Sequence, residues 1–207
     1  MDGEEHMSTE EFWRGEFGNS YTERNVGRVG INKDFFEMAL NEAGDFESLI
    51  EFGAGSGENL QALHEMAPSM ELVGVEINGT AFDKLSARMG AWKSKRSAIF
   101  GSFLHLAPSS KYDTSMAKGI LIHIAPENLP TAYDRLYEAS SKYILIAEYF
   151  SAQPREIEYR GHAGKLWTRD FGGEMMDRHP DLKLVDVGFH YNRTTGQDNL
   201  THWLFQK

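Results

Sequence analysis

Three glycines separated by single residues mark the stretch of the chain best suited to chemistry, Glu51-Phe-Gly53-Ala-Gly55-Ser-Gly57. Glycine lets the backbone turn sharply and lets a ligand lie against it, so such a turn can hold a nucleotide-like cofactor. A dinucleotide-binding turn has its third glycine at the sixth position of G-x-G-x-x-G, where this chain has Glu58. An acidic side chain there disfavours a pyrophosphate and is tolerable beside a positively charged cofactor without phosphate. An ordinary glycine loop is the alternative.

A second acidic residue ends the next strand that the sequence predicts. The run Glu71-Leu-Val-Gly-Val-Glu76 predicts a strand that ends in an acid. A carboxylate only accepts hydrogen bonds, so one carboxylate can take both hydroxyls of a ribose. The acid-x-Gly-x-Gly-x-Gly turn followed by this acid resembles the first motif of the class I S-adenosylmethionine (SAM) methyltransferases.

That resemblance implies SAM as the cofactor and S-adenosylhomocysteine (SAH) as the product. In this fold, residues just past the third strand lie beside the adenine, which here are Ser102 and Phe103. An ordinary core packing of these two residues is the alternative. The expected cofactor-binding residues are Glu51, Gly53, Ala54, Gly55, Glu76, Ile77, Ser102, Phe103, Lys118 and Tyr21.

Methyl transfer from a sulfonium requires an aligned acceptor that has lost its proton, so a general base is sought near the sheet edge. His123 follows the expected fourth strand, and an unperturbed histidine titrates near pH 6.5. A hydrogen-bonded core histidine is the alternative. Glu148 and Tyr149 end the expected fifth strand, at the edge where open α/β sheets bind ligands. A capped strand-end carboxylate is the alternative for Glu148.

Cations gather in the long insert 150–180 of an otherwise acidic chain. Arginine grips a carboxylate or phosphate with two parallel hydrogen bonds, so the insert predicts a site for an anionic small molecule. A solvated loop whose cations pair with Glu156, Glu158 and Asp170 is the alternative. The expected substrate-binding residues are Tyr159, Arg160, His162, Lys165, Arg169 and Arg24.

Composition limits the other classes of function. The chain has 207 residues, a formal net charge of −10 and no cysteine. A strongly acidic chain is a poor binder of nucleic acid or an anionic membrane, and disulfides are excluded. The sequence has no metal-ligand spacing such as His-x-His or His-Glu-x-x-His and no apolar run long enough to span a membrane. We therefore expect a cytoplasmic protein without a bound metal; the sequence sets no oligomeric state.

The order of strand and helix patterns predicts the fold that would position these residues. Five strands alternate with helices, and two alternating runs, 182–190 and 199–205, follow as an antiparallel pair. This order predicts an α/β class I methyltransferase (Rossmann-like) fold, a seven-stranded mostly parallel sheet with helices on both faces. We expect one domain over 1–207, with a tail and possible N-terminal lid over 1–31 and a substrate-side insert over 150–180.

The N-terminal region before the first strand has two readable features. Ser8-Thr-Glu-Glu11 has the spacing of a capping box, and Gly15 and Gly18 interrupt the aromatic segment that follows it. This segment is expected either as a lid over the cofactor or as a helix packed on the sheet. A further helix is expected to start with Asn32 as its N-cap.

Several longer blocks resemble the pseudaminic acid biosynthesis-associated methylase family. They include Phe12-Trp-Arg-Gly-Glu-Phe-Gly18, Lys118-Gly-Ile-Leu-Ile-His-Ile124 and Tyr159-Arg-Gly-His162. This resemblance implies methylation of a nonulosonic (pseudaminic-type) sugar or sugar nucleotide. Two alternatives stay open: methylation of another amine, carboxylate or phosphonate acceptor, or a catalytically silent SAM-binding partner of a glycan pathway.

Overall fold

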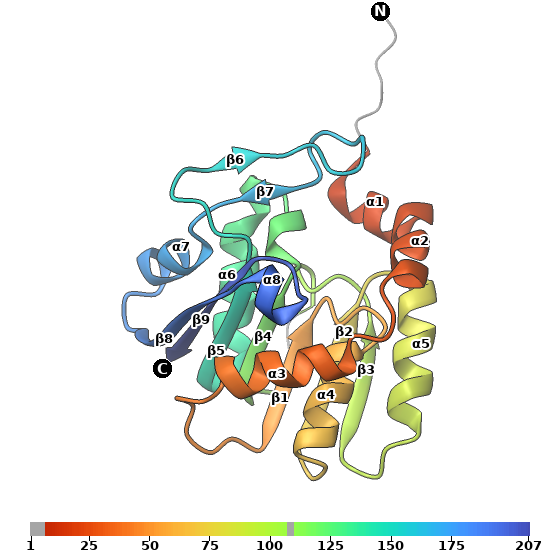
Figure 1. Ribbon diagram of the computed structural model, residues 1–207, viewed down its shortest axis with the longest axis vertical. Helices are drawn as coiled ribbons and strands as arrows, with labels where there is room; N and C mark the ends of the chain where they lie inside the picture. Colours follow the sequence, from red (N-terminus) through yellow and green to blue (C-terminus); the bar gives the residue numbers. More distant parts are fainter. Residues whose placement is uncertain (1–6, 107–109) are drawn as a thin grey trace, which may run out of the picture.

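The computed structural model describes residues 7–106 and 110–207 and is built on one seven-stranded sheet (Figure 1). The strand order is β3-β2-β1-β4-β5-β9-β8. The first five strands along the chain pair in parallel, and β9 pairs antiparallel with both β5 and β8. This confirms the predicted fold class. The strands are β1 (Ser48–Phe52), β2 (Glu71–Glu76), β3 (Arg96–Phe100), β4 (Tyr112–Lys118), β5 (Ser140–Glu148), β8 (Lys183–His190) and β9 (Leu200–Gln206).

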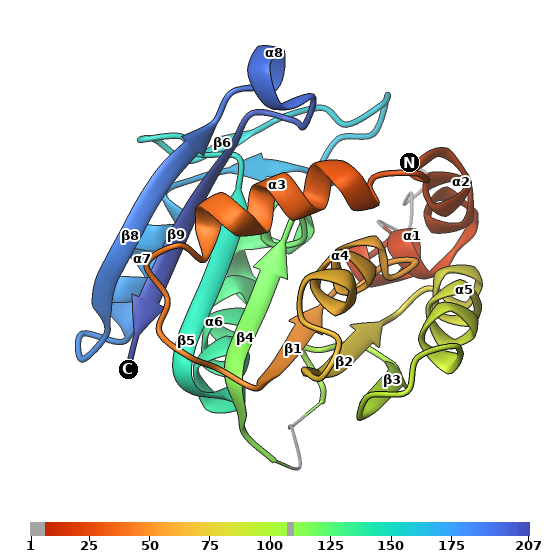
Figure 2. The ribbon, with the colours of Figure 1, turned by 60° about the horizontal axis from the view of Figure 1, so that its bottom comes forward.

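Helices cover both faces of the sheet and enclose a separate apolar core on each (Figures 1 and 2). Phe35, Leu60 and Leu85 anchor one core, and Leu136 and Phe171 anchor the other. Burial of such side chains supplies the main driving force for packing helix on sheet. One face carries α3 (Val29–Ala39), α4 (Glu58–Met66) and α5 (Gly79–Gly90), and the other carries α6 (Leu129–Ala139) and α7 (Phe171–Arg178).

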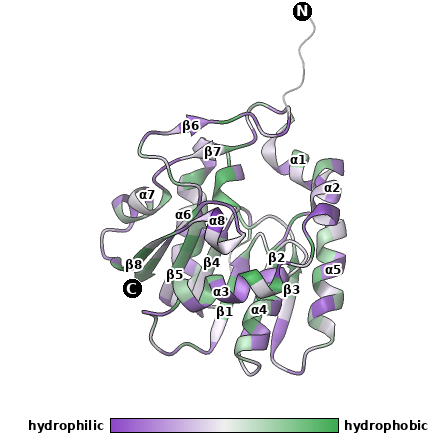
Figure 3. Ribbon diagram, viewed as in Figure 1, coloured by the Kyte–Doolittle hydropathy of each residue, from purple (hydrophilic) through white to green (hydrophobic). Residues whose placement is uncertain are grey.

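The hydropathy of each element agrees with this layering. The residues of β5 from Tyr143 to Glu148 are buried, as expected for a strand covered by helices on both faces. By contrast, α5 carries both hydrophilic and hydrophobic residues along its length (Figure 3), because one side packs on the sheet and the other meets solvent.

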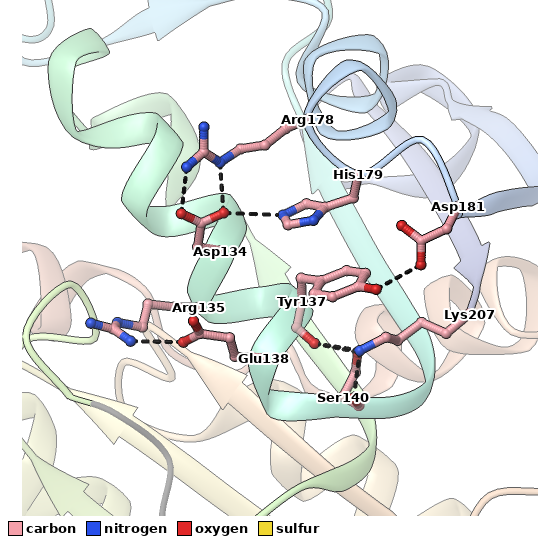
Figure 4. Close-up of polar contacts among 9 residues, drawn as sticks. All are labelled: Asp134, Arg135, Tyr137, Glu138, Ser140, Arg178, His179, Asp181 and Lys207. Atoms are coloured by element: carbon pink, nitrogen blue, oxygen red, sulfur yellow. Dashed lines mark hydrogen bonds and ion pairs between the residues drawn. The ribbon is translucent and has the colours of Figure 1, made fainter.

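A polar cluster fastens the end of the chain to α6 (Figure 4). Arg178, at the end of α7, donates to both carboxylate oxygens of Asp134 in α6. The His179 ring stacks on Tyr137 with ring centroids 4.0 Å apart, and Lys207 Nζ donates to the Tyr137 carbonyl at 2.7 Å. These contacts link α6 to the end of α7 and to Lys207, and none of the residues lines the cavity described below.

The N-terminal segment forms two short helices, α1 (Thr9–Arg14) and α2 (Glu16–Arg24), at the same end of the molecule as the β6 (Arg155–Glu156) and β7 (Trp167–Thr168) pair (Figure 1). The structure confirms the capping box: Ser8 Oγ accepts from the Glu11 amide, and the Glu11 carboxylate accepts from the Ser8 amide. The two helices separate at Gly15. Residues 1–6 of the expected tail lie outside the described residues.

One helix boundary differs from the expectation. Helix α3 begins at Val29, so Asn32 is an interior residue and is not the N-cap. Its side chain is buried, and its Oδ1 accepts from Lys118 Nζ at 3.3 Å. A tertiary contact with the end of β4 uses the carboxamide that the capping pattern had assigned to the helix start.

The remaining helical turns are short. They are η1 (Leu121–His123) and η2 (Pro126–Asn128), which follow β4, and α8 (Asn192–Thr195), which joins β8 to β9. Among the helices in the described part of the chain, none is long and apolar enough to cross a membrane.

Candidate active site

A cavity of about 390 Å³ opens at the carboxyl edge of the parallel strands. Its floor is lined by residues that directly follow four strands: Gly53 after β1, Ile77 after β2, Gly101 after β3 and Gly119 after β4. Chain order reverses between β1 and β4, which is where open α/β sheets bind ligands. The volume falls within the range of roughly 300–1,000 Å³ typical of small-molecule sites.

The glycine turn after β1 forms one wall of the cavity. Gly53 and Gly55 have φ values of +71° and +55°, a conformation that side chains other than glycine rarely adopt. A Cβ on Gly53 would lie 2.1 Å from Ile120 Cδ1, whereas a Cβ on Gly55 would meet no atom within 4 Å. The space beside Gly55 is therefore open to a ligand that approaches the backbone closely.

Glu76 meets this turn through its carboxylate. Its Oε2 accepts from the Gly55 amide and its Oε1 from the Asn78 amide, both at 2.7 Å. Burial raises the pKa of Glu76, and the two backbone amides act in the opposite direction. Each carboxylate oxygen keeps a further lone pair. The side chain lines the cavity and can accept hydrogen bonds from a ligand there.

Ser102 and Phe103 both line the cavity past β3. Ser102 Oγ accepts from the Leu104 amide at 3.2 Å, which leaves its own hydroxyl hydrogen available for another acceptor. The Phe103 ring packs against Phe52 with centroids 4.9 Å apart. This pair offers one polar group beside an apolar surface.

Glu51 and Lys118, which the sequence grouped together, occupy different positions. Glu51 is fully buried and does not line the cavity; its Oε1 accepts from Asn59 Nδ2 at 2.6 Å, and burial raises its pKa to about 7. Lys118 does line the cavity, with its Nζ 5.0 Å from the centroid of the Phe35 ring. Burial lowers its pKa to about 8, and the nearby Glu51 carboxyl acts against that shift.

His123 lines the cavity with a ring orientation fixed by the insert. Its Nδ1 lies 2.7 Å from the Lys165 carbonyl oxygen. Because a carbonyl only accepts, Nδ1 carries the hydrogen, and the neutral ring has its lone pair on Nε2. Burial lowers the pKa of His123 to about 4, so the ring is neutral at physiological pH. Its ring packs against both Trp13 and Tyr159, at centroid distances of 4.4 and 5.0 Å.

Glu148 lies behind the cavity wall. It is fully buried, and its Oε1 accepts from the amides of Ile120 and Leu121 at 2.9 and 2.7 Å. Burial raises its pKa to about 8. Glu148 therefore holds the start of the segment that carries His123. Tyr149 does line the cavity, and burial raises its pKa above the usual range.

Two of the predicted substrate-binding residues, Tyr159 and Arg160, line the cavity. Arg160 is exposed, has a φ of +52°, and its guanidinium carbon lies 6.0 Å from the centroid of the Tyr159 ring. Tyr21, predicted on the cofactor side, also lines the cavity from α2.

The other predicted substrate-binding residues do not line the cavity. His162 packs against the Phe12 ring, and Lys165 Nζ donates to the Met7 carbonyl at 2.6 Å. Arg169 donates to Glu174 at 2.7 Å, and Arg24 lies over the Phe17 ring. Arg169 is thus paired with Glu174, which is none of the acids that the sequence proposed as partners of the insert.

Sequence reasoning missed several residues of this site. Asn32 from α3 and Gln197 and Asp198 from the loop before β9 all line the cavity, as does Trp13 from α1, which the sequence had placed in the possible N-terminal lid. Asn78 lines it as well, and the sequence did hold a signal for this residue, since an asparagine directly after the Glu76 strand can cap the next helix. Within residues 7–106 and 110–207, no group of three or more His, Cys, Asp or Glu side chains is placed to hold a metal ion.

No protein-family model matches the chain, and no curated protein matches its sequence. Solved structures do match. A SAM-dependent methyltransferase of the DUF858 family from Leishmania major has a TM-score of 0.71 at 17% identity, over 95% of this chain and 81% of that one.

Two further structures of known activity match at a TM-score of 0.69. Magnesium protoporphyrin IX methyltransferase from Synechocystis PCC 6803 with bound SAM is 11% identical, over 96% of this chain and 94% of that one. The 1,6-didemethyltoxoflavin-N1-methyltransferase from Burkholderia thailandensis was solved with 1,6-didemethyltoxoflavin and SAH bound. It is 15% identical, over 94% of this chain and 86% of that one. The chain therefore has the fold of the class I SAM-dependent methyltransferases.

Proposed function

We propose that this protein is a SAM-dependent methyltransferase that acts on a small molecule. The observation that carries the proposal is the pairing of the open Gly55 backbone with the Glu76 carboxylate inside the cavity. A carboxylate beside an uncovered glycine fits a ribose that lies against the turn. This combination offers no phosphate cradle, because the neighbouring Glu58 is acidic.

The remaining wall residues fit the other parts of SAM. Ser102 and Phe103 offer a polar group and an apolar surface for the adenine. Ile77, the residue after Glu76, lines the same cavity. Lys118 offers a cation for the carboxylate of the amino acid part, since a pKa of about 8 leaves it mostly charged at neutral pH. Bound SAM would supply a methyl group activated by its sulfonium sulfur.

The chain's own contribution is alignment and exclusion of water. Trp13, Tyr21 and Tyr159 wall the cavity with aromatic rings, and such rings exclude water. The Nε2 lone pair of His123 can accept a hydrogen bond from the acceptor group and so orient it, while a pKa of about 4 makes the ring a weak base. Glu148 positions His123 indirectly by holding the amides of Ile120 and Leu121.

For the acceptor we propose an anionic small molecule, with its negative group at Arg160. The support is that Arg160 is an exposed cation at the cavity wall of a chain with a net charge of −10. The resemblance of the sequence to the pseudaminic acid biosynthesis-associated methylases favours a nonulosonic sugar or sugar nucleotide. Two methyltransferases of similar structure act on compounds as different as magnesium protoporphyrin IX and 1,6-didemethyltoxoflavin. The fold therefore does not select among acceptors.

Calorimetric titration of SAM tests the cofactor part of the proposal. Glu76→Gln places an amide N–H against the donors of Gly55 or Asn78, and we expect at least a tenfold rise in the dissociation constant. Glu71→Gln is the matched control, because Glu71 begins the same strand and does not line the cavity. Equal affinity in the wild type and the folded Glu76→Gln protein would contradict the proposed site.

A metabolite screen scored by SAH release tests the catalytic part. We expect release with an anionic amine or hydroxyl compound, and sugar acids are the first group to assay. A protein that binds SAM and releases no SAH with any acceptor would instead be a silent SAM-binding partner.

A further inference from the structure

Asn78 links three parts of the molecule through one buried side chain. It follows β2 and is 3% exposed. Its Oδ1 accepts from the Ala81 amide at 2.9 Å and so caps the N-terminus of α5. This contact fixes the orientation of the carboxamide, because only the oxygen can accept that hydrogen. The Nδ2 group therefore points to the other side.

On that side Nδ2 faces the N-terminal helices. It donates to Asn19 Oδ1 at 2.9 Å and to the Trp13 carbonyl at 3.1 Å, with the carbonyls of Arg14 and Gly15 at 3.4 Å. The last carbonyls of a helix have no partner within the helix, and Asn78 supplies one from another element for α1.

The contact requires a close approach of α2. A Cβ built on Gly18 would lie 2.7 Å from Asn78 Nδ2 and 1.9 Å from the Trp13 carbonyl oxygen. Only a glycine at this position allows α1, α2 and the Asn78 carboxamide to pack this closely at the junction of the two helices.

The backbone of the same residue reaches the cofactor side of the cavity. The Asn78 amide donates to Glu76 Oε1 at 2.7 Å, and the N-terminal helices that its side chain holds contribute Trp13 and Tyr21 to the cavity wall. We propose that Asn78 is a positioning residue that couples a cofactor at Glu76 to the closure of α1 and α2 over the acceptor side. The proposal rests on the proposed function in one respect, that SAM or SAH binds at Glu76.

This coupling has a physical basis in the way the two helices are held. Away from Asn78, α2 packs against α5, and side chains make further contacts: Phe12 and Phe17 with His162, Trp13 with His123, and Glu10 with His105. A ligand bound at Glu76 adds contacts to the loop that carries Asn78, and so stabilises the arrangement in which the Asn78 donor reaches α1. By linkage, closure of the helices must then strengthen ligand binding by the same factor.

Hydrogen exchange of residues 9–24 with and without SAH tests the proposal. In the wild type we expect SAH to slow exchange in this segment. Asn78→Asp keeps an oxygen to cap Ala81 and replaces the donor with a carboxylate oxygen that repels the carbonyls of α1. We expect exchange in residues 9–24 to rise about tenfold or more, and the SAH-dependent protection to be lost.

The control makes the same chemical change at the other end of the hydrogen bond. Asn19→Asp adds the same charge, yet Asn19 accepts from Asn78, so its carboxylate still accepts and protection should be kept. Asn78→Ser is a second, uncharged variant: its hydroxyl can cap Ala81 and is too short to reach α1, so it should behave as Asn78→Asp does. Exchange in α5 should stay as in the wild type for all three variants.

Two results would overturn the proposal. One is full SAH-dependent protection of residues 9–24 in both Asn78 variants. The other is an equal loss in Asn78→Asp and Asn19→Asp, which would assign the effect to charge alone. A purely structural role would instead raise exchange throughout α5 as well. If SAH fails to bind the wild-type protein, the proposed function fails, and that outcome is separate from a wild type that binds SAH while its Asn78 variants stay protected.

Discussion

The amide of Gly55 donates to Oε2 of Glu76 at 2.7 Å and so joins the turn after β1 to the last residue of β2. Gly55 has a φ of +55° and no neighbour where its Cβ would be, while Glu76 is nearly buried and receives a second amide from Asn78. The carboxylate is thus held in place before any ligand arrives. A fixed acceptor loses little entropy on binding, which favours affinity for a ligand with matching hydroxyls.

The open space at Gly55 leads to the first prediction. Gly55→Ala would place a methyl group in the cavity, and we expect the SAM dissociation constant to rise at least tenfold in a calorimetric titration. Gly27→Ala is the matched control, since Gly27 also has a positive φ and open space but does not line the cavity. Both variants should lose about 1 kcal/mol of stability from the left-handed backbone. Equal SAM affinities in the two variants would contradict the cradle.

Glu148 leads to a prediction about stability and pH. Its folded pKa is raised from 4.5 to about 8, so between these values the folded chain keeps a proton that the unfolded chain has lost. The carboxyl contributes fully to stability below pH 4.5, and this contribution declines as the pH rises to about 8. Glu148→Gln removes the titration and keeps an oxygen for the amides of Ile120 and Leu121.

Urea unfolding of the wild type and Glu148→Gln from pH 5 to pH 9 provides the measurement. The wild-type stability minus that of the variant should fall by a few kcal/mol up to pH 8 and then level off. The difference between the two proteins is needed because His123 and His190 have lowered pKa values of about 4, which make stability rise with pH in the acid range. A difference that stays constant with pH would show that Glu148 is ionised throughout.

The ring of His123 provides the third prediction. Because burial lowers its pKa to about 4 and the Lys165 carbonyl accepts from Nδ1, its NMR signals should titrate near pH 4 and show the Nδ1–H tautomer at neutral pH. Nitrogen-15 chemical shifts report the tautomer. The signal that is missing from the spectrum of His123→Gln is assigned to His123. A midpoint near pH 6.5 would mean that the ring is more hydrated than its packing against Trp13 and Tyr159 indicates.

Arg160 and Arg169 form the comparison for the fourth prediction, once the screen has found an acceptor. Arg160→Ala should lower kcat/KM for that acceptor roughly 10- to 100-fold, as expected for the loss of a charged hydrogen bond, with little change in SAM affinity. Arg169→Ala should change kcat/KM by less than about threefold, because Arg169 binds Glu174 outside the cavity. Equal losses in both variants would indicate an effect on the insert as a whole.

The sequence alone determined the features that depend on residues close to one another along the chain. The glycine turn, the acid that ends β2, the capping box at Ser8 and the order of seven strands follow from spacing and periodicity over short stretches. Helix α3 marks the limit of such patterns. Asn32 has the chemistry of an N-cap, yet its side chain accepts a hydrogen bond from Lys118 at the end of β4 and the helix begins at Val29.

Only the tertiary structure decided which polar side chains reach the cavity. Glu148 is the last residue of β5 and Tyr149 is the first residue after it, yet Tyr149 lines the cavity while Glu148 binds the amides behind its wall. Among the cations of the insert, the path of the loop brings Arg160 to the cavity and leaves Arg169 with Glu174. Asn78 meets α1 and α2 across more than 50 residues, a contact set by the packing of whole helices, which no local pattern in the chain records.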